Sequence, residues 1–276
     1  MAPHQISLEQ LAKPLDRSQF VRPIAHRGLH DHAATIVENT GPAFKAAIRS
    51  GFGIECDVRA AAGGRPIIFH DATTDRLTNR QGDTATLTER DLETVAHAGS
   101  GAPILTLSAG LKLVAGRAPI LVEVKSMWNR TAIQPDDSFI AQLCSALVAY
   151  EGPAAVMSFD PDILAAIKAR EPQIPRGLVA TGYVDTMPLP KNLTAKRAKA
   201  LAELEDAPRV KPSFVAYNVN DLPTPQTQHL RAMGYPVFAW TVRTDQQRTK
   251  ASTYADAAIF ERELQTRVAP GESQQR

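Results

Sequence analysis

The sequence has little of several features that mark specialised classes of protein. Only two cysteines occur among its 276 residues, and both Cys56 and Cys144 lie in apolar patterns, so we do not expect a disulfide framework. Aromatic residues make up 6% of the chain. No uninterrupted hydrophobic stretch reaches the length of a transmembrane helix, so stable membrane insertion is not expected.

An excess of charge of one sign is also missing. The 31 lysines and arginines nearly balance the 29 acidic residues, and there is no basic run. A nucleic-acid partner is therefore not expected. The N-terminus, MAPHQISLEQLAKPLDRSQF, has no apolar core of signal-peptide length, which predicts a cytoplasmic protein. The oligomeric state is not determined by the sequence.

What the chain does contain is a regular alternation of short apolar segments with helical patterns. The predicted strands are Val21–Ala25, Gly53–Val58, Pro119–Val124, Ala154–Met157, Gly177–Ala180, Phe214–Tyr217, Pro236–Thr241 and Ala257–Phe260. The predicted helices are Asn39–Ser50, Leu107–Ala115, Asp136–Tyr150, Pro161–Arg170, Thr194–Glu205, Pro225–Met233 and Asp245–Ser252. About eight strands in roughly 250 residues predict an α/β fold, a (β/α)₈ TIM barrel, in one domain spanning residues 1–276. A doubly wound open sheet is the alternative.

One segment interrupts this alternation after the second predicted strand. Residues from about 63 to 105 contain a short predicted strand, Ile67–Phe69, and a helix that begins near Thr88, with a capping box formed by Thr88 and Asp91. We interpret this segment as a small insertion over the barrel mouth. Residues from about 270 to 276 are interpreted as a frayed tail.

Polar residues cluster where the predicted strands end. Glu55 and Asp57 are two residues apart, so they share one face of their strand, and Glu123 and Lys125 repeat this spacing on the next barrel strand. Glu55, Asp57 and Glu123 would form an all-oxygen site suited to one divalent cation, Mg²⁺ or Ca²⁺. The alternative is that Glu55 and Asp57 face solvent on an ordinary antiparallel strand.

Two histidines and two cations complete the cluster. His26 and His70 follow neighbouring strands, and their ordinary pKa allows one to accept a proton while the other donates one. Arg27 and Lys125 are candidates for holding phosphate oxygens. Taken singly, His70 could be a hydrogen-bonded structural residue and Lys125 a surface lysine.

The ordered set of motifs resembles the glycerophosphodiester phosphodiesterases. The motifs are His26-Arg27-Gly28, Glu38-Asn39-Thr40, Pro42-Ala43-Phe44, Glu55-x-Asp57, His70-Asp71, Glu123-x-Lys125, Ser158-Phe159, Ala239-Trp240-Thr241-Val242 and, more weakly, Asp256 to Phe260. The likeness extends over nearly the whole chain from Val21 onward. It implies a TIM barrel that hydrolyses glycerophosphodiesters to glycerol 3-phosphate and an alcohol with a divalent cation.

Carried over by position, the resemblance assigns a role to each residue of the motifs. The expected metal ligands are Glu55, Asp57 and Glu123, the acid and base are His26 and His70, and the phosphate contacts are Arg27 and Lys125. Glu38 and Asn39 would shape the site, and Trp240 would form an apolar wall near the glycerol. Asn39 or Thr40 could instead be the N-cap of the following helix.

The chain departs from the family pattern in three places. Val37 stands where proline is usual, Gly41 replaces a commoner leucine, and Phe260-Glu261-Arg262 lacks the usual Thr-Asp pair. None of these changes removes a proposed catalytic group. They do affect the loop after the first strand and the rim of the eighth.

Other functions remain open at this point. A phospholipase-type phosphodiesterase acting on lipid or lysolipid would need an exposed apolar rim. A barrel that only binds phosphodiesters would be expected to lack a histidine or a ligand carboxylate, and a dinuclear hydrolase would want more histidine ligands. The headgroup, the choice of metal, the order of acid and base, and direct attack by water or by a glycerol hydroxyl are not decided.

Overall fold

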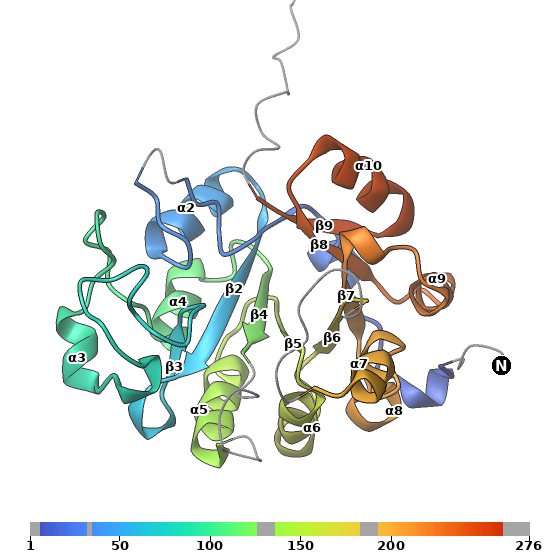
Figure 1. Ribbon diagram of the computed structural model, residues 1–276, viewed down its shortest axis with the longest axis horizontal. Helices are drawn as coiled ribbons and strands as arrows, with labels where there is room; N and C mark the ends of the chain where they lie inside the picture. The colour runs from blue at the N-terminus through green and yellow to red at the C-terminus, as the bar shows by residue number, and fades with distance from the viewer. Residues whose placement is uncertain (1–5, 32–34, 126–135, 183–192, 262–276) are drawn as a thin grey trace, which may run out of the picture.

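A computed structural model of the chain describes residues 6–31, 35–125, 136–182 and 193–261. Its strands form one sheet in which β1 pairs with both β2 and β9, and this pairing closes the sheet into a barrel (Figure 1). Neighbouring barrel strands are parallel, whereas β3 is an extra strand that pairs antiparallel with β2. The predicted TIM barrel is confirmed.

The strands and helices alternate as predicted. The strands are β1 Ile24–Ala25, β2 Gly53–Ala60, β3 Pro66–Ile68, β4 Ile120–Val124, β5 Ala154–Ser158, β6 Arg176–Ala180, β7 Phe214–Asn218, β8 Val237–Val242 and β9 Ala257–Phe260. The α-helices are α1 Arg17–Phe20, α2 Gly41–Arg49, α3 Glu89–Thr94, α4 Leu107–Val114, α5 Asp137–Val148, α6 Pro161–Arg170, α7 Ala195–Ala202, α8 Ala207–Val210, α9 Pro225–Ala232 and α10 Asp245–Tyr254. Short 3₁₀ turns are η1 Leu8–Gln10, η2 Ala62–Gly64, η3 Thr84–Thr86 and η4 Val219–Asp221.

The first strand is shorter than predicted. The sequence pattern predicts a strand from Val21, but ladder pairing begins only at Ile24. The backbone N–H of Arg22 bonds back to the carbonyl of Phe20 in a turn, and Pro23 has no N–H to donate to a neighbouring strand. The strand therefore starts after the proline.

One apolar layer lies inside the ring of strands, and a second lies between the strands and the surrounding helices. Alternate residues such as Leu121, Phe214 and Phe238 pack inside the ring of strands. Residues such as Cys56 and Val122 point outward and pack against the helices. This period of two places Glu55, Asp57 and Glu123 on the inner side of their strands, as the sequence predicts.

The N-terminal segment closes the barrel at the end where the strands begin. Leu15 and Phe20 join the inner apolar cluster, and the backbone N–H of Leu15 donates to the carbonyl of Ser213, just before β7. The described interior is thus apolar at the start of the strands. Polar groups collect at the other end.

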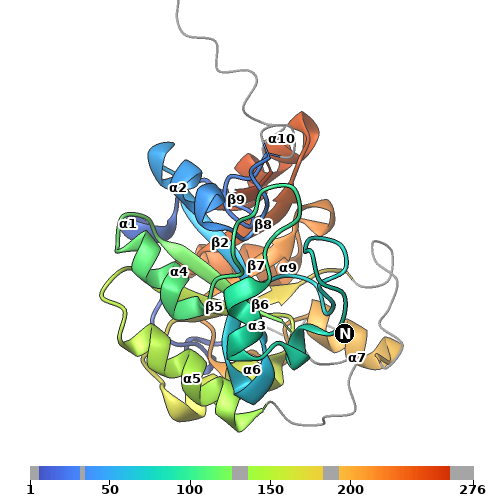
Figure 2. The same cartoon turned by 90° about the vertical axis from the view of Figure 1, so that its left-hand side faces the viewer.

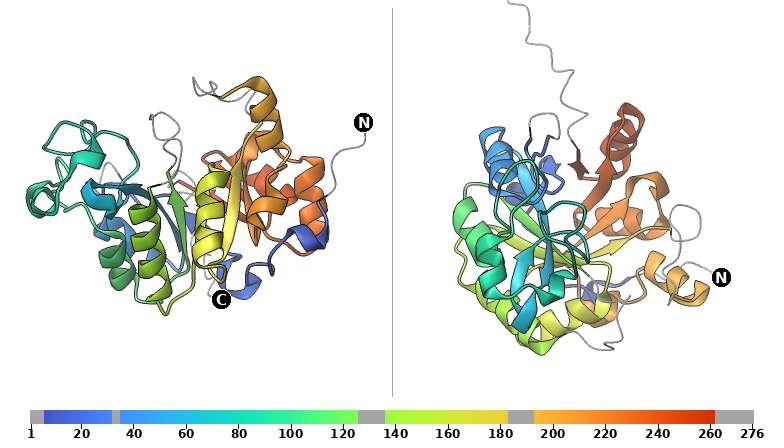
Figure 3. Two further views of the ribbon diagram at one scale, coloured as in Figure 1. Left: turned by 90° about the horizontal axis from the view of Figure 1, so that it is seen from below. Right: turned by 60° about the vertical axis from the view of Figure 1, so that its left-hand side comes forward.

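The insertion folds beside β2. Its strand β3 pairs with the C-terminal half of β2, and the N–H of Phe69 donates to the carbonyl of Asp57. It has a small apolar cluster of its own, which includes Phe69 and Leu87. Helix α3 lies at the left-hand edge in Figure 1 and faces the viewer in Figure 2, and the insertion, in teal, lies at the left in the left panel of Figure 3. The helix begins with the predicted capping box of Thr88 and Asp91. The insertion therefore flanks the strand ends and delivers His70 to them.

Within the described part of the chain, no helix combines the length and the apolar character that a membrane span requires.

Candidate active site

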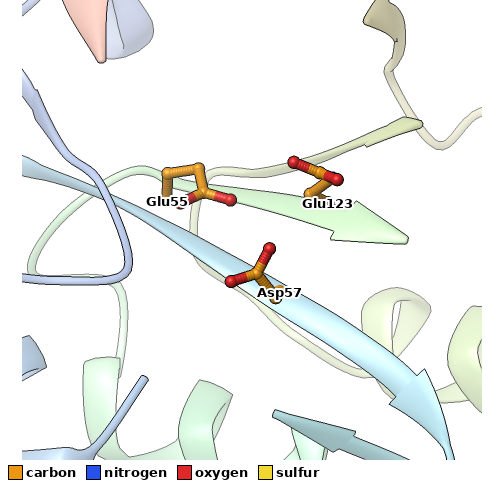
Figure 4. Close-up of side chains that lie close together, drawn as sticks. All are labelled: Glu55, Asp57 and Glu123. Atoms are coloured by element: carbon orange, nitrogen blue, oxygen red, sulfur yellow. The ribbon is translucent and has the colours of Figure 1, made fainter. Parts of the chain in front are cut away.

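Three carboxylates converge inside the barrel, two from the middle of β2 and one from near the C-terminal end of β4. Asp57 is the direct ladder partner of Glu123, and Glu55 lies two residues earlier on β2 (Figure 4). One oxygen from each carboxylate lies within 4.8 Å of the others. All three residues are buried, with exposed fractions of 0%, 0% and 7% for Glu55, Asp57 and Glu123. The predicted acidic cluster is present.

The triad has the properties of a site that could bind a metal ion. The backbone N–H of Arg27 donates to Glu55 Oε2 at 2.8 Å, but the buried Oε1 of Glu55 has no hydrogen-bond partner among the described residues. Burial raises the pKa of Glu55 well above its ordinary value, and the negative charges of Asp57 and Glu123 raise it further. A dication bonded to oxygen ligands would relieve both the lost hydration and the repulsion.

Lys125 places a positive charge inside the triad. Its Nζ lies 2.7 Å from Asp57 Oδ1 and also contacts Glu123 Oε1. Burial opposes the charged form, but the two carboxylates outweigh it and raise the pKa of Lys125 above its ordinary value. Lys125 is therefore a partly buried, charged member of the site and not a surface lysine. Its predicted contact with phosphate stays a prediction.

Asn39 belongs to the site and does not cap a helix with its side chain. Its Nδ2 donates to Asp57 Oδ2 at 2.7 Å, and its Oδ1 accepts from the Asp57 backbone N–H at 3.1 Å. The positive φ of 58° at Asn39 turns the chain so that both bonds can form. Thr40 is the N-cap residue of α2, and its hydroxyl bonds to the Val37 carbonyl.

Arg27 and Glu38 connect the loop after β1 to the triad. Arg27 Nη1 donates to Glu38 Oε1 at 2.7 Å, while Arg27 Nε lies 3.3 Å from Asp57 Oδ2. Glu38 also accepts from Arg76 of the insertion, at 2.8 Å. Burial alone would raise the pKa of Glu38, but these two arginines lower it to about 2. Glu38 is thus a buried anion that holds two guanidinium groups.

The two histidines are each held by a carboxylate. His26 Nδ1 lies 2.8 Å from Glu261 Oε1, and His26 Nε2 lies 3.9 Å from Glu55 Oε2. His70 Nδ1 lies 2.7 Å from Asp71 Oδ1. Burial lowers the pKa of His70, and the negative charge of Asp57 offsets this decrease only in part. Each ring therefore has one nitrogen engaged by an anion.

An aromatic wall lies on the other side of the mouth. Trp240 on β8 and Phe159 after β5 meet edge to face, with ring centroids 5.2 Å apart and an interplanar angle of 84°. Both rings pack on the inner apolar cluster of the barrel. The mouth is thus charged beside β1, β2 and β4 and aromatic between β5 and β8.

The matches to known proteins agree with this geometry. Residues 26–262 match the model of the glycerophosphoryl diester phosphodiesterase family. The chain belongs to this family. The resemblance predicted from the sequence motifs is confirmed, and the matched range includes every residue of the site described above.

Two curated relatives illustrate how far the likeness extends within the family. A glycerophosphodiester phosphodiesterase of Caldanaerobacter subterraneus is 33% identical over 132 residues, which are 47% of each chain. Glycerophosphodiester phosphodiesterase 1 of Bos taurus is 42% identical over 80 residues, 29% of this chain and 22% of the relative. The chain thus spans half or less of the length of these curated relatives.

A solved structure shares the fold over nearly its whole length. It is a phosphodiesterase of Oleispira antarctica in complex with the product sn-glycerol-3-phosphate. The TM-score is 0.71 at 22% identity, and the match covers 87% of this chain and 92% of the other. At this identity the likeness shows the TIM barrel.

The structure brings together the residues that the sequence singled out and adds three others. Glu261, Arg243 and Arg76 were not among the candidate residues of the sequence, yet they bind His26, Glu261 and Asp71, respectively. Glu261 directly follows the last strand, β9, just as His26 and Lys125 follow theirs. Applying the same rule to every barrel strand would have found it. Arg76 lies inside the insertion, and no local pattern singles it out.

Proposed function

We propose that this protein hydrolyses glycerophosphodiesters to glycerol 3-phosphate and an alcohol, using a divalent cation and the two histidines as acid and base. The supporting observation is that Asp57 stands at the centre of all the necessary groups. Asp57 forms ion pairs with Lys125 and Arg27 and accepts a hydrogen bond from Asn39. Burial would raise its pKa, but the charges of Lys125, His70, Arg27 and His26 lower it below its ordinary value. Acid, base, anion-binding groups and metal-type ligands thus share one space.

Glu55, Asp57 and Glu123 would hold the cation, and their oxygen-only donor set suits Mg²⁺ or Ca²⁺ better than zinc. When bound, the cation would supply positive charge to balance the phosphate oxygens. Arg27 would add hydrogen bonds to the same oxygens from the loop after β1. Trp240 and Phe159 would exclude water from the apolar face of the glycerol or the alcohol.

The two histidines divide the proton transfers between them. One accepts the proton of the attacking hydroxyl, and the other gives a proton to the oxygen of the leaving alcohol. The attacker is either water or the 2-hydroxyl of the glycerol, in which case a cyclic phosphate forms first. Phosphorus NMR during turnover distinguishes these two routes, because only the second accumulates or passes through a cyclic glycerophosphate.

The aqueous diester is the substrate class we favour over a lipid. Among the described residues, the large hydrophobic side chains with high exposure are Leu8 and Val148, at 63% and 53%. Leu8 lies in the N-terminal segment and Val148 at the end of α5, on the side of the barrel where the strands begin. Neither position is suited to presenting a lipid to the carboxylates.

Release of glycerol 3-phosphate from glycerophosphocholine and glycerophosphoethanolamine tests the proposal. We expect activity with Mg²⁺ or Ca²⁺, loss with EDTA, and a decrease of at least about 100-fold in His26→Ala and His70→Ala. His229→Ala is the matched control, since His229 bonds to the carbonyl of Ile6 away from the site. Full activity in EDTA or in either active-site histidine variant would contradict the proposal.

A further inference from the structure

Closure of the barrel brings three residues from distant parts of the chain into one hydrogen-bonded group. His26 follows β1, Glu261 follows β9 and Arg243 follows β8, and β9 lies between β1 and β8 in the sheet. The backbone N–H of His26 donates to the Phe260 carbonyl, and that of Glu261 donates to the Val242 carbonyl. The backbone on both sides of Glu261 is thus anchored to its neighbours.

The Glu261 carboxylate is held from two directions. Arg243 donates from Nε to Oε2 and from Nη2 to Oε1, both at 2.7 Å, while Oε1 lies 2.8 Å from His26 Nδ1. Burial would raise the pKa of Glu261, but the hydrogen bonds from His26 and Arg243 lower it well below its ordinary range. Glu261 is therefore an anion, and a carboxylate anion can only accept hydrogen bonds. Nδ1 of His26 must carry the hydrogen.

A second group of the same composition holds His70. Asp71 Oδ1 lies 2.7 Å from His70 Nδ1, and Arg76 donates from Nε to Asp71 Oδ2 at 2.6 Å. This group is built from one continuous segment of the insertion, whereas the His26 group is assembled from three loops. The same arrangement of histidine, carboxylate and arginine therefore arises twice from unrelated parts of the sequence.

We infer that Glu261, clamped by Arg243, is a positioning residue for His26: it fixes the ring as the Nδ1–H tautomer and leaves Nε2 directed at the acidic triad. This inference rests on the proposed function for its kinetic consequence. A histidine in the wrong tautomer cannot exchange a proton through Nε2 with the substrate. Loss of Glu261 should therefore slow turnover and leave substrate affinity nearly unchanged.

The tautomer is measurable without turnover. In protein carrying ¹⁵N-labelled histidine, at about pH 8.5 where free imidazole is neutral, long-range ¹H–¹⁵N spectra distinguish a protonated from a bare ring nitrogen. The His26 signals are assigned by their disappearance in His26→Ala. We expect wild-type His26 to be protonated at Nδ1 and bare at Nε2, and Glu261→Ala to show a mixture of the two tautomers.

Kinetics provide the second readout. Glu261→Ala should lower kcat by about 10- to 100-fold with a change in KM below about 3-fold, and Arg243→Gln should lower kcat by a smaller factor. Sodium formate, which can refill the space of the missing carboxylate, should restore kcat of Glu261→Ala several-fold. Sodium chloride at the same ionic strength should not.

Arg17→Gln is the matched control. Arg17 pairs at 2.9 Å with Asp256, which precedes β9 at the opposite end of the same strand from Glu261. Removing this pair should change neither the His26 tautomer nor kcat. This control separates the effect of losing any ion pair next to β9 from the effect of losing the contact between Glu261 and His26.

The outcomes separate this inference from the proposed function. Wild-type His26 protonated at Nε2, or an unchanged tautomer in folded Glu261→Ala, would overturn the positioning role even if the enzyme is active. If wild type releases no glycerol 3-phosphate but the tautomer responds as expected, the proposed function fails and the geometric part stands. Should Glu261→Ala not fold, the wild-type tautomer and Arg243→Gln decide the question.

Discussion

Several charged residues in this protein are removed from water and are stabilised by neighbouring residues of opposite charge. Glu38 is buried between Arg27 and Arg76, and the partly buried Lys125 lies between Asp57 and Glu123. His97 in the insertion is different. It is 1% exposed, its ring lies beside that of Phe69 at a centroid distance of 5.8 Å, and neither ring nitrogen has a hydrogen-bond partner among the described residues.

His97 should make the stability of the fold depend on pH. Burial lowers its pKa from 6.5 to about 4, so the unfolded chain binds a proton at a higher pH than the folded chain. Stability is then fully present above pH 6.5 and falls as the pH drops toward 4. Between pH 7 and 5 the loss should be about 2 kcal/mol. Urea unfolding at both pH values measures it.

His97→Leu is the control for this pH effect, because leucine is apolar and does not titrate. The variant should lose about 2 kcal/mol less than wild type between pH 7 and 5. An equal loss in the two proteins would assign the effect to other groups.

Asn39 offers a test of a side chain that sequence alone left between two roles. Asn39→Gly removes both hydrogen bonds to Asp57 while keeping a residue that accepts the positive φ. We expect activity to fall by about 10-fold. Thr40→Ser keeps a hydroxyl residue at the N-cap of α2, and its activity should stay within about 2-fold of wild type. The two variants are compared by their rates of glycerol 3-phosphate release. Circular dichroism determines the folded fraction of each.

At the scale of elements, strand ends are secured by groups that the apolar pattern does not reveal. Arg176 opens β6 and is 3% exposed. Its guanidinium donates to the backbone carbonyls of Val210, Pro172 and Ile174. It therefore ties the end of α8 and the turn after α6 to the bottom of the barrel, and burial lowers its pKa.

Arg176→Met should destabilise the barrel without affecting its chemistry. Three backbone carbonyls would lose their donor, two of them in buried hydrogen bonds, at an expected cost of about 2–4 kcal/mol in the free energy of unfolding. The activity per folded molecule should not change, because the site lies at the other ends of the strands. Arg170→Gln, at an exposed arginine paired loosely with Asp137 at 3.7 Å, should cost less than about 0.5 kcal/mol in the same urea titration.

The bounds of the helices and strands show which elements the sequence pattern can predict. Helix α6 and strand β9 have the predicted bounds, because Asp160 and Pro161 begin the helix and a continuous run of four apolar residues makes the strand. The short helices α1 and α8 were not predicted. At four residues each they are too short for a helical period to be visible, and their formation depends on packing against the barrel.

At the scale of the whole molecule, the barrel brings the carboxylates of Glu55, Asp57 and Glu123 together, and a divalent cation bound there should stabilise the fold. A dication that binds the folded triad and not the unfolded chain raises the free energy of unfolding by about 2.7 kcal/mol at 100 times its Kd. We therefore expect Tm to rise with CaCl₂ or MgCl₂ and to return with EDTA. NaCl at equal ionic strength is the control for screening.

Glu123→Gln should abolish most of this rise while keeping the size of the side chain. The same variant removes one of the negative charges that raise the pKa of Glu55. The Tm of the metal-free protein should therefore fall by less than the rise that the cation gives wild type. A rise in Tm as large in Glu123→Gln as in wild type would place the cation elsewhere.

The sequence alone determined the alternation of strands and helices and the inward side of each strand, because period-two and helical patterns are local properties. It favoured a barrel over a doubly wound sheet, and the pairing of β1 with β9 decided between the two. It also located Glu55, Asp57, Glu123 and both histidines at strand ends. Only the tertiary structure decided that Lys125 lies between two carboxylates and that Glu261, itself held by Arg243, contacts His26. Glu261 and His26 are 235 positions apart, and their contact exists only because the barrel closes between β1 and β9. Lys125 meets Asp57 because β4 lies beside β2 in the sheet.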